Sequence, residues 1–311
     1  QAYAAFCKQG QTAGLDAFCD QQQSWLGDYT LYMAIKQAQG GLSWQKWPAP
    51  LRLREKDALQ QAQQICAEER GFHAFVQYQA YGQWQALKQY ANDSGVEIMG
   101  DLPIYVALDS ADVWANRELF CLDDAGWPTA VAGCPPDAFA TDGQLWGNPL
   151  YDWPVHQRTG FAWWLQRMQA AFTLFDAVRV DHFRGFESYY AIPFSAGTAR
   201  RGSWLPGPGI AFIHALQARF GNAPIIAEDL GFLTPEVQAL LRESGYPGMK
   251  VLQFAFDTRE RQDYRPYTYP ENCVVYTGTH DNDTTAGWLC SGRRDDVRLA
   301  KRYLGCTGQS T

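Results

Sequence analysis

The chain has 311 residues, enough for one large α/β domain or two smaller ones, and 46% of them are hydrophobic, as in folded globular proteins. The net charge of −7 argues against a nucleic-acid partner, because phosphate binding requires a basic surface. No run approaches the ~20 continuous apolar residues that span a bilayer, so we expect no membrane partner either.

The first 95 residues are predicted to form a helical subdomain that leads into the rest of the chain. Apolar side chains recur at helical spacing over 25–37. A second helix is expected from about Glu69 to Tyr90, and the NDSG turn at 92–95 ends it.

Beyond residue 95, five short apolar runs bounded by polar and Gly residues are predicted to be buried strands. They cover 96–106, 175–183, 223–231, 249–256 and 273–281. Helices are expected at 161–172, about 210–220, 234–245 and 295–305. In 234–245, Thr234 is the expected N-cap, Pro235 the first helical residue and Gly245 the stop. This alternation is typical of an α/β fold with a parallel sheet covered by helices.

The segment 107–160 separates the first two predicted strands and is dense in Gly, Pro, Trp and Asp, so we expect a long loop there. Loops of this length are usually functional or disordered, and the aromatic residues between Trp127 and Trp153 argue against disorder. Exposed aromatic rings would suit sugar binding. A large aromatic core would explain the 12 Trp, 16 Tyr and 17 Phe residues equally well.

Three carboxylates each follow a predicted strand: Asp181, Glu228 and Asp281. The carboxyl ends of parallel strands meet at one edge, where α/β enzymes build their active sites. Arg179 lies two residues before Asp181 and points to the same face, where its charge would keep Asp181 ionised as a nucleophile. Glu228 could hold its proton in a partly apolar pocket. Asp281, beside His280, could stabilise positive charge on a sugar ring.

Enzymes that cleave glycosidic bonds with retention use two carboxyl groups in different environments, one as nucleophile and one as acid/base. These two groups lie roughly 5–5.5 Å apart. The competing interpretations are structural. An Arg-x-Asp pair on a strand is more often an ion pair than a catalytic pair, and an acid at a strand end is often a helix N-cap. The recurrence of such an acid after three strands favours the catalytic interpretation over the structural ones.

Metal and nucleotide sites are not expected from the motifs. The five His residues show no HExxH or H-x-H spacing, and neither GxGxxG nor GxxxxGK(S/T) occurs. His182 and His280 both flank candidate catalytic acids, and hydrogen bonding to a substrate explains them better than zinc does. The eight cysteines have no CxxC pair or framework spacing, which favours free thiols in a reducing, cytoplasmic compartment.

The sequence around the candidate acids resembles a known family. RVDHFRG, AEDLG and GTHDNDT, with GDLPIYV upstream, look like the conserved regions of the α-amylase clan. The loop GCPPDAFATDGQLWGNPLYDW and the segment SADVWA are similar, more specifically, to the 4-α-glucanotransferases called amylomaltases or disproportionating enzymes. The resemblance covers nearly the whole chain, from WLGDYTLYMAIK to the end.

This resemblance implies a role for each matching position. Asp181 corresponds to the nucleophile, Glu228 to the acid/base and Asp281 to the stabiliser of the transition state. The positions that match substrate contacts are Arg179, His280, Asp101, Asp137, Phe139, Gln144 and Trp146. The last four lie in the loop that overhangs the glucan in the family. Between two of them stands Ala138, where some members have Tyr, which puts one stacking contact in question.

The resemblance also implies a (β/α)8 TIM barrel. The run 96–106 corresponds to its third strand, so the five predicted strands would be strands three to seven of an incomplete catalytic barrel in 96–311. The segment 107–160 would cover the substrate. We therefore expect a fragment of a longer enzyme, and its true start upstream, since the chain opens QAYAAFCKQG without an initiator Met.

The implied activity is the transfer of α-1,4-glucan segments between glucans, including maltooligosaccharides, without a cofactor or a metal. Two alternatives stay open. The same triad could hydrolyse α-1,4-glucan, since only the attacking group, a sugar hydroxyl or water, would differ. The aromatic loop favours transfer because it would exclude water and bind an acceptor. The other alternative is a non-catalytic glucan-binding module, against which the intact triad argues.

Overall fold

The computed structural model describes residues 1–10, 12–136, 140–231, 233–259 and 264–306. The α-helices are α1 (Ala2–Lys8), α2 (Ala13–Gln21), α3 (Leu26–Ala38), α4 (Ala49–Arg52), α5 (Lys56–Ile65), α6 (Ala67–Asp93), α7 (Ala111–Ala115), α8 (Trp153–Arg158), α9 (Ala162–Leu174), α10 (Ile210–Phe220), α11 (Pro235–Ser244), α12 (Thr285–Ser291) and α13 (Arg294–Tyr303). The strands are β1 (Met99–Leu102), β2 (Ala130–Cys134), β3 (Gln144–Pro149), β4 (Ala177–Val180), β5 (Ser188–Pro193), β6 (Ser203–Pro206), β7 (Ile225–Ala227), β8 (Gly248–Val251) and β9 (Cys273–Tyr276).

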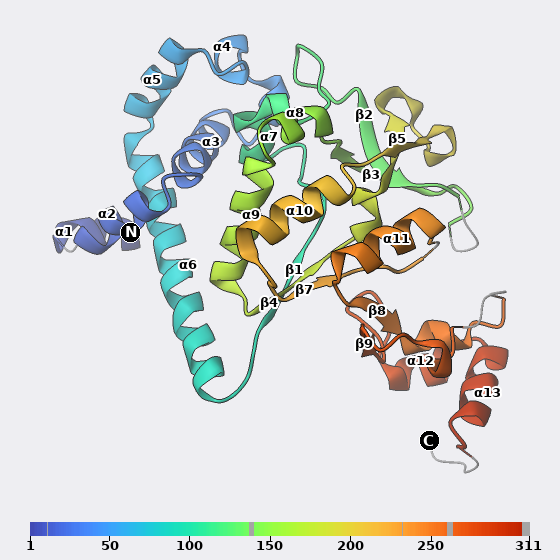
Figure 1. Ribbon diagram of the computed structural model, residues 1–311. Helices are drawn as coiled ribbons and strands as arrows, with labels where there is room; N and C mark the ends of the chain where they lie inside the picture. Colours follow the sequence, from blue (N-terminus) through green and yellow to red (C-terminus); the bar gives the residue numbers. More distant parts are fainter. Residues whose placement is uncertain (11, 137–139, 232, 260–263, 307–311) are drawn as a thin grey trace.

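The parallel strands lie in the order β1-β4-β7-β8-β9. β1, β4 and β7 pair directly, and so do β8 and β9. The two groups are joined by a hydrogen bond from the Ala227 N–H to the Pro247 carbonyl (2.9 Å). Asp229 adds to this link by accepting hydrogen bonds from the Met249 N–H (2.7 Å) and Lys250 Nζ (2.9 Å). Helices α9, α10 and α11 alternate with these strands along the chain, which confirms the predicted α/β fold (Figure 1).

Each predicted strand and helix has a counterpart in the structure, although the strands are shorter than the apolar runs that predicted them. Thr234 caps α11 by accepting from the Val237 N–H, and Gly245 ends the helix with φ +69°. The prediction of a strand over all of 249–256 is wrong, because residues Leu252–Phe256 form a 3₁₀ helix. This turn buries Phe256 against α13. A short apolar run in the sequence fits a buried helical turn as well as a buried strand, so the sequence did not separate the two.

The long helix α6 connects the helical N-terminal region to β1 (Figure 1). Its Trp84 Nε1 donates to the Leu174 carbonyl at the end of α9 (2.8 Å). Near its C-terminus, Asn92 Nδ2 donates to Asp176 Oδ2 (2.9 Å), which also accepts from the Ile98 N–H (2.8 Å). These contacts hold the chain where β1 begins and so fix the position of β1 beside β4.

A second, antiparallel sheet has the strand order β3-β2-β5-β6 (Figure 1). β2 and β3 lie within 107–160, together with α7 and α8, so the expectation of a loop over this segment is corrected. These strands are short, and the first half of β3 is exposed. These two strands are therefore recognisable from their backbone hydrogen bonds, and not from a periodic pattern of apolar residues in the sequence.

The main hydrophobic core packs the parallel strands against the helices, and its centre is aromatic. Trp164 of α9 is fully buried, and its ring lies 6.4 Å from Trp153, 5.3 Å from Phe186 and 5.4 Å from Phe212, measured between centroids. Its indole N–H has no hydrogen-bond partner among the described residues. A large aromatic core thus accounts for part of the aromatic content.

Two further features are the apolar character of the helices and the state of the cysteines. Within the described ranges, no helix combines the length and the apolar character that crossing a bilayer requires. None of the eight cysteines, all of which are described, forms a disulfide. Cys66 is buried, whereas Cys7, Cys290 and Cys306 are exposed.

Replacing Trp164 by Ala should lower the free energy of unfolding by about 3–5 kcal/mol, because it removes a fully buried ring and leaves a cavity. Trp164→Phe should cost less, since it keeps a ring and removes an N–H that has no partner in the described part of the chain. Urea unfolding of both variants and the parent measures the changes. Equal losses for the two variants, or a loss below about 1 kcal/mol for Ala, would contradict this expectation.

Candidate active site

Three candidate acids lie at the carboxyl ends of three adjacent strands. Asp101 is in β1, Asp181 directly follows β4, and Glu228 directly follows β7. The Asp181 N–H donates to the Leu102 carbonyl of β1, and the Glu228 N–H donates to the Val180 carbonyl of β4, both over 3.0 Å. The hydrogen bonds between neighbouring parallel strands therefore continue as far as Asp181 and Glu228, and they place the three acids side by side.

The Arg179 guanidinium connects two of these acids. Its Nη1 lies 2.6 Å from Asp101 Oδ1, and its Nη2 lies 2.9 Å from Asp181 Oδ1. Its Nε faces Met249 Sδ of β8 at 3.3 Å, and the side chain is only 10% exposed. Arg179 is paired with Asp101 in the β1–β4 register, so the two side chains share a face. One cation thus fixes the orientation of two carboxylates.

Burial and three neighbouring charges act on the ionisation of Asp181. Burial raises its pKa above the ordinary value, Arg179 lowers it, and the nearby carboxylates of Asp101 and Asp281 raise it again. The net shift is upward. Arg179 therefore orients Asp181 and lowers its pKa against the effects of burial and of the other acids, which agrees with the predicted role of its charge.

Glu228 is 8% exposed, and both of its oxygens accept backbone hydrogen bonds. Oε2 accepts from the His182 N–H (2.8 Å), and Oε1 accepts from the Leu230 N–H (2.7 Å). Burial raises the pKa of Glu228 to about 7; the Leu230 N–H opposes this shift, and the charge of Asp181 adds to it. A carboxyl with this pKa is present in both protonation states at neutral pH, which suits a group that donates and then accepts a proton.

His182, for which sequence analysis favoured hydrogen bonding to a substrate over zinc binding, takes part in this geometry through its backbone N–H. Its φ is +52°, a left-handed conformation that is strained for a non-glycine residue, and this conformation is the one in which its N–H reaches Glu228. Burial and the charge of Arg184 lower the pKa of its imidazole to about 4, so the ring is neutral at pH 7. Its position beside a candidate acid in RVDHFRG was the signal that could have found it.

Asp281 and His280 lie on the turn that follows β9. Asn282 Oδ1 holds this turn by accepting from the Thr279 N–H (2.9 Å) and hydroxyl (3.0 Å). His280 Nε2 lies 3.6 Å from Asp281 Oδ1 and 3.8 Å from Asp101 Oδ2. The turn brings Asp281 to the same edge as the other acids, where its side chain remains 69% exposed.

The antiparallel sheet supplies the aromatic side of the site. Trp146 of β3 donates from Nε1 to Gln144 Oε1 (2.9 Å), and its ring lies edge-on to His182 with 4.9 Å between centroids. Tyr105, which sequence analysis did not single out, lies 6.1 Å from the Trp146 ring. Two predicted site residues, Asp137 and Phe139, lie outside the described residues, together with the intervening position 138.

The described residues thus bring together Asp101, Arg179, Asp181, Glu228, His280, Asp281, Gln144 and Trp146. Among them and the rest of the described chain, no cluster of three or more His, Cys, Asp or Glu side chains is placed to hold a metal ion. The arrangement is a row of carboxylates in unequal environments, organised by one arginine and flanked by an indole.

Comparison with known proteins shows the family of the chain. A family model described as 4-alpha-glucanotransferase matches residues 1–311. The chain belongs to this family. It is 52% identical over 294 residues to a 4-alpha-glucanotransferase of Thermus thermophilus, covering 94% of this chain and 59% of that protein. It is 45% identical to the chloroplastic/amyloplastic 4-alpha-glucanotransferase of Solanum tuberosum, covering 90% of this chain and 49% of that protein.

Solved structures include an amylomaltase from Streptococcus agalactiae in complex with acarbose. It is 41% identical to this chain, with a TM-score of 0.90, and the match covers 96% of this chain and 60% of that one. The chain therefore spans between 49% and 60% of the length of these relatives.

Glu228 should make folding stability depend on pH. Its pKa rises from the ordinary 4.5 to about 7 on folding, so the stability that this carboxyl contributes is fully present below about pH 4.5 and is lost as the pH rises through 7. Glu228→Gln removes this titration. Relative to the parent, the variant should gain up to about 3 kcal/mol of unfolding free energy between about pH 4 and pH 8.

Urea unfolding of parent and variant across this pH window provides the measurement. Glu236→Gln is the matched control, because backbone and Thr234 hydrogen bonds at the start of α11 lower the pKa of Glu236. Its difference from the parent should change with pH in the opposite direction. A difference between Glu228→Gln and the parent that stays constant over the window would contradict the raised pKa.

Proposed function

We propose that this chain carries the catalytic centre of a 4-α-glucanotransferase, which moves α-1,4-glucan segments to an acceptor glucan or glucose by a retaining double displacement. The observation that carries this proposal is the pair formed by Asp181 and Glu228 on adjacent strand ends. Parallel strands lie about 4.8 Å apart, close to the spacing of about 5–5.5 Å that retaining enzymes use between their two carboxyl groups. The raised pKa of Glu228 suits the acid/base of the pair.

In the first step, Asp181 attacks the anomeric carbon and forms an ester bond to the glucan segment. The glycosidic C–O bond breaks, and Glu228 gives its proton to the departing oxygen. In the second step, the ionised Glu228 takes the proton from the 4-hydroxyl of an acceptor glucan, whose oxygen displaces Asp181 from the same carbon. The two carboxyl groups supply nucleophile, acid and base, so this reaction needs no cofactor or metal.

The remaining site residues would bind and orient the sugar. Arg179 holds Asp181 in line through the 2.9 Å contact. Asp281 would stabilise the positive charge that develops on the ring, and His280 and Asp101 would hydrogen-bond its hydroxyl groups. Trp146, which is partly exposed next to His182, would pack against a glucose unit, with Gln144 fixing its indole. Asp137 and Phe139 stay predictions of further substrate contacts.

We also infer that β1, β4, β7, β8 and β9 are the third to seventh strands of a (β/α)8 barrel. Inward side chains of such barrels meet in layers built from alternate strands. Arg179 of β4 meets Met249 of β8 across β7, and the Tyr276 hydroxyl of β9 lies 3.5 Å from Met99 Sδ of β1. In a flat sheet the outer two of five strands would be about 19 Å apart, so the second contact requires strong curvature. The other strands would lie in the part of the relatives that this chain does not span.

Within this proposal, residues 1–95 form a helical subdomain and 96–311 form the catalytic barrel portion, in which 107–160 covers the substrate. The first part contains α1 to α6, and β1 begins shortly after it. The substrates are α-1,4-glucans and maltooligosaccharides, which agrees with the relatives named 4-alpha-glucanotransferase. A cytoplasmic location and the absence of a nucleic-acid partner stay predictions.

Incubating the full-length enzyme with maltotriose tests the proposed reaction. Transfer produces a ladder of longer maltooligosaccharides, whereas reducing ends that rise without a ladder would indicate hydrolysis and refute transfer. Asp181→Ala should lower turnover by at least about 10⁴-fold, because no other group can form the covalent intermediate. Asp295→Asn, on the exposed surface of α13, should retain activity as the matched control. Near-normal turnover of Asp181→Ala would refute the mechanism.

The pH profile of kcat/KM should fall on the alkaline side as the pH rises through about 7, because Glu228 must carry a proton to release the leaving group. It should also fall in acid as Asp181 becomes protonated, at a higher pH than for an ordinary Asp because its pKa is raised. Initial rates with maltotriose across the pH range measure both limbs. A profile that stays flat from about pH 6 to pH 9 would show that Glu228 is not the acid.

A further inference from the structure

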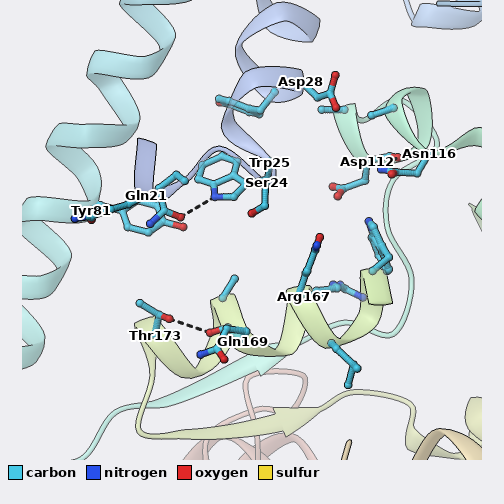
Figure 2. A pocket seen from close by; sticks show the side chains of 18 of the residues that line it. Gln21, Ser24, Trp25, Asp28, Tyr81, Asp112, Asn116, Arg167, Gln169 and Thr173 are labelled. Carbon is cyan, nitrogen blue, oxygen red and sulfur yellow. Dashed lines mark hydrogen bonds between the residues drawn. The ribbon is translucent and has the colours of Figure 1, made fainter. Parts of the chain in front are cut away.

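A cavity of about 540 Å³ lies between the helical N-terminal region and helices α7 and α9 (Figure 2). Its lining comes chiefly from α3, α6, α7, α9 and the turn that joins α2 to α3. We call it the interhelical cavity. None of the described candidate active-site residues lines it, so it is distinct from the row of carboxylates at the strand ends.

Four aromatic side chains that line the interhelical cavity are neither fully buried nor fully exposed: Trp25, Tyr29, Tyr81 and Trp163. The rings of Trp25 and Tyr81 are stacked, with 6.0 Å between centroids and 24° between planes. Figure 2 shows Trp25 and Tyr81 on one side of the cavity, with Asp112 and Arg167 on the other. Flat aromatic rings beside a few polar groups are typical of small-molecule sites and match the apolar faces and hydroxyl edges of a sugar ring.

The polar groups of the cavity offer both donors and acceptors. Burial raises the pKa of the Asp112 carboxyl, and the charge of Arg167 and the indole of Trp163 oppose this shift. Arg167 is held in place by the carbonyls of Pro103 (2.6 Å) and Ile104 (3.1 Å). Neutral polar side chains on the lining include Gln21, Ser24, Asn116, Gln166 and Gln169.

The charges of the lining cancel. Two acidic side chains, Asp28 and Asp112, and two basic ones, Arg167 and Arg219, line the cavity. Asp28 forms an ion pair at 2.6 Å with Arg54, which does not line the cavity. The lining residues alone carry no excess of either charge, and Arg54 adds one positive charge behind Asp28. A neutral ligand with many hydroxyl groups could use its donors and acceptors together with its aromatic faces.

We propose that the interhelical cavity is a secondary binding site for a short run of α-1,4-linked glucose units. The identity of the sugar rests on the proposed function. The volume falls within the range of about 300–1,000 Å³ that is usual for small-ligand sites. A long glucan held here would keep its other segments at a high effective concentration around the chain, including the proposed active site.

Direct binding tests the proposal independently of turnover. Maltotetraose is titrated by calorimetry into the full-length protein carrying Asp181→Asn, which prevents consumption of the sugar. Adding Trp25→Ala or Asp112→Asn should remove one class of site or weaken it about tenfold. Trp127→Ala is the matched control, because Trp127 stacks on Phe194 outside the cavity. It should leave binding unchanged.

Asp112→Asn retains the side-chain shape, so it tests the site even where Trp25→Ala lowers the midpoint of thermal unfolding. Trp146→Ala, measured in parallel, reports on the proposed active site. Loss of binding with Trp146→Ala alone would overturn the cavity proposal and leave the proposed function standing. Loss with the cavity variants alone supports the cavity site whatever the fate of the proposed function. Equal binding of cellotetraose, which has β-1,4 links, would overturn the assignment to α-1,4-glucan.

Discussion

The contact of one guanidinium with two carboxylates is the interaction on which the candidate site depends. Arg179 lies between Asp101 and Asp181, which would repel each other without it. It can reach both because β1 and β4 pair with Asp101 opposite its own position. A shift of one residue in this register would turn the Arg179 side chain to the other face of the sheet. The chemistry at the strand ends therefore rests on the alignment of two short strands.

That alignment is supported from outside the sheet. Asp176, just before β4, binds both the end of α6 and the backbone that leads into β1, so the helical region helps to place the acids. The antiparallel sheet acts from the other side and brings Trp146 against His182. Two parts of the chain that carry no catalytic acid thus determine how the acids are oriented and covered.

The sequence predicted the acids and their strands because both leave local signals: apolar runs, and an acid where each run ends. It predicted α11 from Thr234 and Gly245, whose capping roles depend on nearby residues alone. It missed β3, since QLWGNP is half exposed and is recognisable only from its pairing with β2. It could not give the net direction of the Asp181 pKa shift, which sums burial and three charges from separate segments. The left-handed His182 also has no signature in side-chain patterning.

The left-handed turn at His182 has a mechanical consequence. The N–H that Glu228 accepts belongs to the planar peptide unit that begins at the carbonyl of Asp181. Besides the support from α6 and the antiparallel sheet, a short path of a few covalent bonds and one 2.8 Å hydrogen bond connects the two carboxyl groups. Slow flexing of the surrounding layers would move both groups together. Their separation, on which the proposed retention of anomeric configuration depends, is therefore buffered against deformation elsewhere in the molecule.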